Sequence, residues 1–97
     1  MTKTLIVRYQ TLPEAADENA RLIEGVFAAL ADLAPVGFDY TAYRLSDGVS
    51  FVHVASLDDD ANPLAGLPAF ADFQRDLPGR CAAPPAPSDA IVVGSYR

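Results

Sequence analysis

A predicted hairpin between Phe38 and Leu57 is apolar on both of its faces, and this constrains the fold more than any other feature of the sequence. Its turn contains Asp47-Gly48, a dipeptide typical of tight β-hairpins. With these two residues as the loop, the cross-strand pairs are Ser46–Val49, Arg44–Phe51, Ala42–His53 and Tyr40–Ala55.

Strand alternation then divides the hairpin residues between two faces. One face carries Phe38, Tyr40, Ala42, Phe51, His53, Ala55 and Leu57. The other carries Thr41, Tyr43, Leu45, Val52 and Val54. An antiparallel sheet in a small monomer usually keeps one polar face for water. Because the rest of the chain is too short to cover both faces, we expect a second copy of the chain to cover one of them.

The remaining elements follow from periodicity and from helix-breaking residues. The sequence predicts a strand over residues 3–10, a helix from Pro13 or Glu14 to Leu33, strands over 38–45 and 49–57, a helix from Pro68 to Leu77, an extended connector over 82–88 and a last strand over 90–96. The first helix has an apolar stripe formed by Ala16, Ala20, Ile23, Phe27 and Leu30, flanked by Leu22, Val26 and Leu33. Leu64 and Leu67 are expected in a turn before the second helix, which Pro78-Gly79 should end.

This order of elements is β-α-β-β-α-β, which predicts an α+β, ferredoxin-like domain over residues 1–97. Right-handed crossovers place both helices on one face of a four-stranded antiparallel sheet. The other face is left open, and its apolar strand residues favour packing of two sheets face to face. We therefore expect a homodimer with a barrel-like interior.

Composition limits the classes of partner. The chain has 97 residues, 51% of them hydrophobic, and a net charge of −6. Its seven Lys and Arg residues are scattered, which argues against nucleic acid and anionic membranes as partners. We find no pattern of a signal peptide or of a membrane span. The lone Cys81 favours a packed or partly exposed thiol near a helix end, and we expect a cytoplasmic protein without a metal or other cofactor.

Several segments resemble the dimeric α+β barrel superfamily, and in particular small bacterial proteins grouped with the antibiotic biosynthesis monooxygenases. The resemblance covers nearly the whole chain. It rests on residues 7–9, 18–22, 43–54, 62–64, 67–74 and 93–96. It implies the same fold and dimer, and a cofactor-independent, quinone-forming oxygenase activity.

The chain departs from the family at the pocket. The characterised enzymes rely on an Asn and a Trp that line it, and this chain has no Trp. Asn19 and Asn62 fall at a helix start and in a loop, so we transfer no catalytic residue from the family to either.

His53 and Tyr40 are the candidate catalytic residues. His53, the only histidine, lies in mid-strand and could act as a general base or hydrogen-bond donor. The alternative, which we favour, is a structural histidine that packs between aromatic rings and bonds to a tyrosine or a carbonyl. If both of its nitrogens are bonded to protein, the enzyme hypothesis loses its only group that titrates near pH 7.

Further pocket candidates are Phe38, Phe51, Tyr9, Arg8 and Phe73. Aromatic walls suit a flat ligand, although tyrosines on strands are also common at dimer interfaces. Alternation allows only one of Tyr40 and Tyr43 to face the pocket. Arg8 could bind a substrate carboxylate or phenolate, but a structural ion pair is the more frequent role. The run Asp58-Asp59-Asp60 lacks the ligand spacing of a calcium loop and predicts a solvated turn.

Two functions of different class remain open from the sequence. One is a cofactor-independent monooxygenase acting on a small aromatic or polyketide-type compound. The other is a non-catalytic dimer that binds a small apolar ligand or serves as an interaction module.

Overall fold

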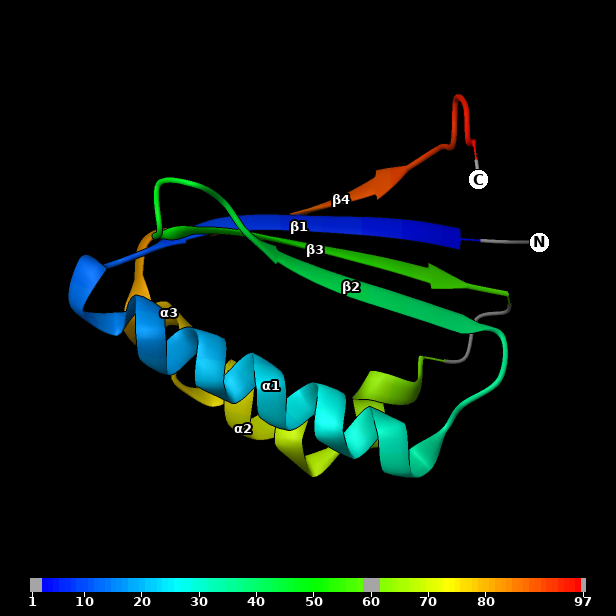
Figure 1. The fold of residues 1–97 in the computed structure, drawn as a ribbon, viewed down its shortest axis with the longest axis horizontal. Helices are drawn as coiled ribbons and strands as arrows, with labels where there is room; N and C mark the ends of the chain where they lie inside the picture. The colour runs from blue at the N-terminus through cyan, green and yellow to red at the C-terminus, as the bar shows by residue number, and fades with distance from the viewer. Residues whose placement is uncertain (1–2, 59–61, 97) are drawn as a thin grey trace.

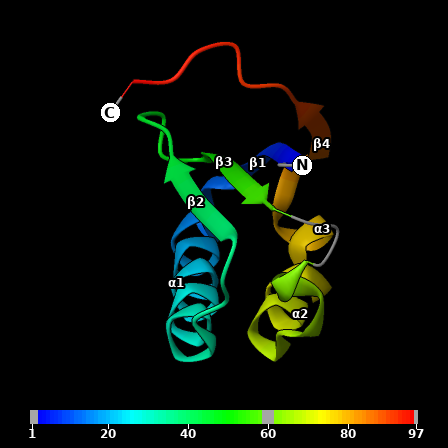
Figure 2. The same cartoon turned by 90° about the vertical axis from the view of Figure 1, so that its right-hand side faces the viewer.

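A four-stranded antiparallel sheet carries all of its helices on one face, as Figures 1 and 2 show. The computed structural model describes residues 3–58 and 62–96. The strands are β1 (Lys3–Thr11), β2 (Phe38–Arg44), β3 (Ser50–Leu57) and β4 (Cys81–Ala90), in the order β2-β3-β1-β4. The helices are α1 (Ala16–Leu33), α2 (Pro68–Arg75) and the single turn α3 (Leu77–Arg80), with 3-10 turns η1 (Pro13–Ala15) and η2 (Pro63–Gly66). The predicted α+β, ferredoxin-like fold is therefore confirmed.

The hairpin has the predicted register. Arg44 lies opposite Phe51, Ala42 opposite His53 and Tyr40 opposite Ala55. The loop is longer than predicted, because β2 ends at Arg44 and β3 begins at Ser50. Phe51 is 1% exposed on the helix side of the sheet, whereas Val52 is only half-buried on the other side. The first of the two predicted faces is thus the one that the helices cover.

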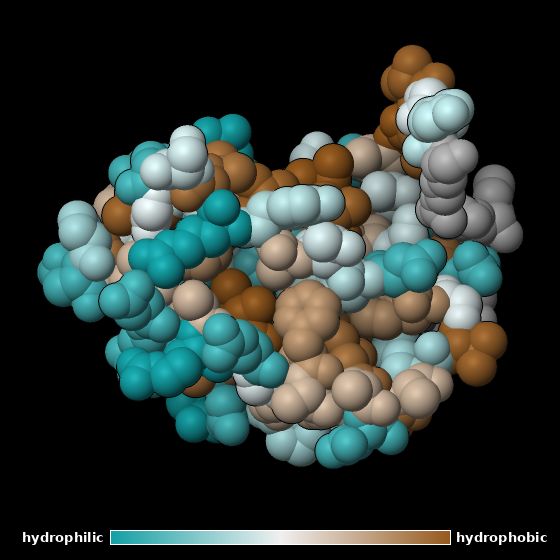
Figure 3. Space-filling model, viewed as in Figure 1, coloured by the Kyte–Doolittle hydropathy of each residue, from teal (hydrophilic) through white to brown (hydrophobic). Residues whose placement is uncertain are grey.

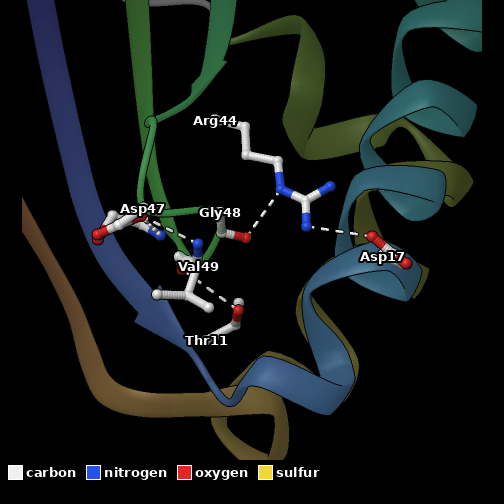
Figure 4. Close-up of polar contacts among 7 residues, drawn as sticks. Thr11, Asp17, Arg44, Asp47, Gly48 and Val49 are labelled. Carbon is white, nitrogen blue, oxygen red and sulfur yellow. Dashed lines mark hydrogen bonds and ion pairs between the residues drawn. The ribbon is translucent and has the colours of Figure 1, made fainter.

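Polar contacts of the β2–β3 turn connect it to α1 and β1 (Figure 4). The Arg44 guanidinium donates to the Gly48 carbonyl over 2.8 Å and lies 3.1 Å from the Asp17 carboxylate of α1. The Asp47 carboxylate accepts from the backbone N–H groups of Val49 and Ser50 and from the Ser50 hydroxyl. These three bonds hold the pKa of Asp47 below its usual value.

Helix α1 buries most of the predicted stripe, with two differences. The predicted start at Pro13 is a 3-10 turn, and the α-helix begins at Ala16. Leu33 is 54% exposed, whereas Asn19, which is not part of the predicted stripe, is fully buried. The helix ends at Leu33, and the next residue, Ala34, has a left-handed backbone with φ 48°.

The second helical region continues past its predicted end. Leu64 and Leu67 form the expected buried turn before α2, but Pro78-Gly79 does not stop the helical segment. Instead, Pro78 lies in the first turn of α3, a position where proline loses no helical hydrogen bond. This extra turn buries Leu77 and Arg80.

The last strand lies earlier in the chain than predicted. Strand β4 spans Cys81–Ala90 and contains the segment predicted to be a connector, whereas residues 91–96 have no regular secondary structure. The prolines are accommodated because β4 is an edge strand, paired with β1 alone. After β4 the chain lies on the side of the sheet opposite the helices and exposes apolar residues such as Ile91 and Val93 (Figures 1, 2 and 3).

The core lies between the sheet and the helices. It contains Tyr9, Ala16, Ile23, Val26, Leu30, Phe51, Leu64, Leu67, Phe73 and Leu77. No helix in the described ranges is both long enough and apolar enough to cross a membrane. In the aspartate run predicted to be a solvated turn, Asp58 is exposed, and Asp59 and Asp60 lie outside the described residues.

Two glycines give a matched test of the backbone. Gly37 has φ 73°, and a Cβ there would lie 3.0 Å from Asp58 Oδ2, whereas Gly25 is helical with open space around it. We expect Gly37→Ala to lower the free energy of unfolding by about 1–2 kcal/mol and Gly25→Ala to raise it by about 0.5–1 kcal/mol. Urea denaturation measures both values. Equal effects of the two substitutions would contradict the assigned backbone at Gly37.

Candidate functional site

A cavity of about 470 Å³ lies between the helix side of the sheet and the α2 region. Strands β1, β3 and β4 contribute apolar residues to its wall, including Val7, Ala55 and Pro87, and the α2 region contributes Leu64, Phe70 and Phe73. The polar side chains of the cavity wall belong to Tyr9, Tyr40, His53, Asn62 and Gln74.

Three of these residues form one hydrogen-bonded cluster. His53 Nε2 lies 2.9 Å from the Tyr9 hydroxyl, and His53 Nδ1 lies 2.5 Å from the Tyr40 hydroxyl. His53 pairs with Ala42 of β2 on one side and with Val7 of β1 on the other. Tyr40 and Tyr9 lie two residues from these partners, so alternation places all three side chains on the face of the sheet that the helices cover. The His53 ring also lies 5.6 Å from the Phe73 ring, measured between centroids.

The cluster continues into the core through two buried polar residues. Asn19 Nδ2 donates to the Tyr9 hydroxyl over 2.9 Å, and Arg80 Nε donates to Asn19 Oδ1 over 3.1 Å. Arg80 also donates to the Phe73 carbonyl over 2.7 Å, and its Cζ lies 5.4 Å from the Phe73 ring centroid. Arg80 is 7% exposed and Asn19 is fully buried. A continuous polar chain therefore runs from α3 through α1 to β1, β3 and β2.

Burial reinforces the neutral form of His53, Tyr9 and Tyr40, the titratable groups of the cavity wall, near pH 7. Desolvation lowers the pKa of His53 to about 4, because its charged form would lose hydration. Desolvation also raises the pKa of Tyr9 to about 12, against the lowering effect of the Asn19 hydrogen bond. Burial raises the pKa of Tyr40 as well, with a smaller contribution from Tyr9.

The geometry fits the structural interpretation of His53 better than the general-base interpretation. Both ring nitrogens are bonded to tyrosine hydroxyls, and the ring is 5% exposed between aromatic neighbours. A group with a pKa near 4 is a weak base toward substrates at neutral pH. The cluster can nevertheless orient a ligand through hydrogen bonds.

The other predicted pocket residues divide between three places. Tyr9 and Phe73 line the cavity together with Tyr40 and His53. Phe51 lies beside Tyr9, its partner on the neighbouring strand, with ring centroids 5.6 Å apart, and is 1% exposed. Phe38 lies at a second cavity of about 400 Å³, beside α1, which Tyr40 also lines.

The structure does not bring Arg8 to the cavity. Arg8 is an exposed residue of β1 between Val7 and Tyr9, so alternation places it on the opposite face of the sheet. The two ion pairs found among the described residues do not include it. Tyr43 is also on that face and is 53% exposed, which confirms that only Tyr40 of this pair faces the cavity. Tyr96, predicted on a strand, lies in the irregular segment after β4.

Sequence reasoning missed Asn19 and Arg80. Asn19 had a detectable signal, because it lies three residues after Ala16 and four before Ile23, within the buried stripe of α1. Arg80 had none, because it follows the Pro78-Gly79 pair that was expected to end the helix. The described residues contain no group of three His, Cys, Asp or Glu side chains suited to a metal ion.

Solved structures share this fold over nearly their whole length. The Mycobacterium tuberculosis protein Rv0793 superposes with a TM-score of 0.77 at 17% identity, covering 100% of both chains. A structure named antibiotic biosynthesis monooxygenase has a TM-score of 0.77 at 15% identity, covering 97% of this chain and 100% of its own. SnoaB, a cofactor-independent oxygenase from Streptomyces nogalater, has a TM-score of 0.71 at 18% identity, covering 97% and 95%.

These likenesses confirm the predicted relation to the fold of the antibiotic biosynthesis monooxygenases. At such low identities they establish the fold and not the activity. No protein-family model matches the sequence, and no curated protein sequence matches it either.

The lowered pKa of His53 makes stability depend on pH. Between about pH 6.5 and 4 the unfolded chain binds a proton at His53 that the folded chain does not, so stability falls as pH falls through this window. We expect the free energy of unfolding to drop by about 2 kcal/mol between about pH 7 and about pH 5. Urea denaturation at both pH values measures it. His53→Gln, which cannot titrate, should show little of this drop, and an equal drop in both proteins would contradict the assignment.

Proposed function

We propose that the cavity binds a small, mostly apolar aromatic molecule that carries an oxygen atom, and that the protein oxygenates it without a cofactor. The observation that supports this most is the cavity itself. Its wall is mainly apolar, and the Tyr9–His53–Tyr40 cluster supplies concentrated polar groups at one place. A mainly apolar pocket with a few placed polar groups is typical of a small-molecule site.

The reaction balances without a redox cofactor. An activated methylene group between aromatic rings becomes a ketone by taking up one oxygen atom of O₂. The second oxygen atom leaves as water with the two methylene hydrogens, and the substrate supplies all four electrons. His53 and Tyr40 are the candidate catalytic residues, since a hydrogen bond from this cluster would stabilise the enolate oxygen that forms before O₂ is reduced.

Ligand binding without catalysis is the second candidate function. It is favoured by the bonding of both His53 nitrogens and by the pKa of about 4, because no strong base for the methylene proton is then present in the cluster. Under this alternative the same aromatic molecules bind and no oxygen is consumed.

The open face of the sheet supports a homodimer. The half-buried Ile6, Val52 and Val54 lie on it, and the segment after β4 exposes Ile91 to 90% and Val93 to 99% on the same side. Apolar surface that is shared by the same face of two identical chains favours their association. We therefore propose that two sheets pack face to face. A cytoplasmic location remains a prediction from the sequence.

Anthrone, a tricyclic ketone with one activated methylene, tests the activity. We expect the protein to accelerate oxygen uptake, measured with an oxygen electrode, and His53→Ala to slow it. Ala65→Trp, which adds bulk at an exposed residue of the cavity wall, should abolish both binding and uptake. Ala71→Trp, on an exposed position of α2 outside the wall, is the matched control. Binding without any protein-dependent uptake would select the second candidate function, and no binding would refute both.

Two neighbouring residues of β3 test the dimer. Val52→Asp should leave the chain folded but shift its sedimentation from about twice 10.3 kDa to 10.3 kDa, because Val52 faces away from the helices. Phe51→Asp should instead abolish folding, since it buries a charge in the core. Circular dichroism and sedimentation at micromolar concentration separate the two results. A monomeric wild-type protein would refute the proposal.

A further inference from the structure

Arg80 determines which group donates and which accepts in each hydrogen bond of the buried polar chain. A guanidinium has N–H donors and no acceptor, so the amide of Asn19 must turn its oxygen toward Arg80 Nε. The Asn19 amide nitrogen then faces Tyr9 and donates to its hydroxyl oxygen over 2.9 Å. The orientation of an asparagine that is ambiguous in many proteins is thus determined here by a neighbour that can only donate.

The Asn19 orientation determines which group donates in the hydrogen bond between Tyr9 and His53. The Tyr9 hydroxyl has one hydrogen, and with Asn19 donating to its oxygen that hydrogen is available for His53 Nε2, 2.9 Å away. The opposite arrangement, with His53 Nε2 protonated, would leave the hydrogen of a 3% exposed hydroxyl without a partner among the described residues. One tyrosine hydrogen lacks a protein partner in either arrangement, and an unpaired donor costs more on the buried Tyr9 than on the half-buried Tyr40, so the first arrangement is favoured.

The remaining proton of the neutral imidazole is then on Nδ1, and it is donated to the Tyr40 hydroxyl oxygen. The hydrogen of Tyr40 itself has no second protein partner within the described part of the chain, and Tyr40 is less buried than Tyr9. Tyr40 and His53 both line the cavity. The last hydrogen of the chain is therefore available to a molecule in the cavity.

We propose that Arg80 and Asn19 are positioning residues that set His53 in its Nδ1–H tautomer, so that Tyr40 offers a hydrogen to the cavity and selects ligands with an acceptor oxygen. A carbonyl or a phenolate would be accepted, and a ring without oxygen would lose this contact. This inference rests on the proposed function only in assuming that the cavity holds a ligand. The raised pKa of Tyr40 supports it, because the hydroxyl then keeps its proton at neutral pH.

Nitrogen-15 NMR of His53 measures its tautomer without any ligand. We expect the wild-type spectrum to show a proton on Nδ1 and none on Nε2. Asn19→Asp replaces the donor with a carboxylate that only accepts, so Tyr9 must donate to it and accept from His53 Nε2. The variant should therefore show the Nε2–H tautomer. A wild-type protein with Nε2–H would overturn the inference, even if Asn19→Asp fails to fold.

Fluorenone and fluorene, tricyclic rings with and without a carbonyl, test the ligand class. Wild type should bind fluorenone with a carbonyl stretch shifted to lower frequency, as a hydrogen bond requires. Tyr40→Phe and Asn19→Asp should each weaken fluorenone binding about three- to tenfold, remove the shift and weaken fluorene binding less. Equal losses for both probes, or an unshifted carbonyl in wild type, would overturn the inference.

Arg80 variants separate positioning from a general loss of stability. Arg80→Lys keeps a group that only donates and should retain the Nδ1–H tautomer and the carbonyl shift. Arg80→Gln can donate or accept and should give a mixture of tautomers. The same tautomer in both variants would remove Arg80 from the proposal. If neither probe binds wild type, the proposed function is refuted, while the tautomer is still decided by the ligand-free spectrum.

Discussion

The arrangement of the helices over the sheet depends on the hydrogen bonds of the buried Arg80 guanidinium. A charge out of water is tolerated only where its donors are bonded, and here neutral oxygens of Asn19 and Phe73 accept them while the Phe73 ring lies against the cation. One residue of α3 thereby contacts both α1 and α2. Through Tyr9 the same network reaches the sheet, so α1 and the α2–α3 region cannot shift relative to β1 without breaking a buried hydrogen bond.

The same network determines what the cavity can offer to a molecule. Its titratable side chains are neutral at physiological pH, since burial lowers the pKa of His53 and raises those of both tyrosines. Recognition must then depend on hydrogen-bond direction and on apolar contact rather than on charge. This explains why the lone histidine, which attracts attention in the sequence, has less scope for chemistry than its position at the cavity suggests.

The sequence was sufficient for the sheet and insufficient for its edges and for the site. Alternation and Asp47-Gly48 define the register of the hairpin, because a one-residue slip of β3 would turn the buried Phe51 away from the helices. The end of the chain was assigned wrongly, since Ile91, Val92 and Val93 have stronger strand propensity than the proline-rich segment that actually pairs with β1. Strand propensity does not take into account that an edge strand needs backbone N–H donors on one side only. The site depends on contacts such as Arg80 with Asn19, 61 residues apart, which no local pattern contains.

Strand β4 has a consequence for how this chain behaves when it is concentrated. Three of its ten residues, Pro84, Pro85 and Pro87, have no backbone N–H, and this strand forms one outer edge of the sheet. An exposed edge with a full set of donors is a template on which further strands add, and it is a common origin of amyloid-like fibres. The prolines deprive that edge of donors, so stacking along the sheet direction is discouraged there. Open-ended growth by addition of further strands at this edge is thus disfavoured.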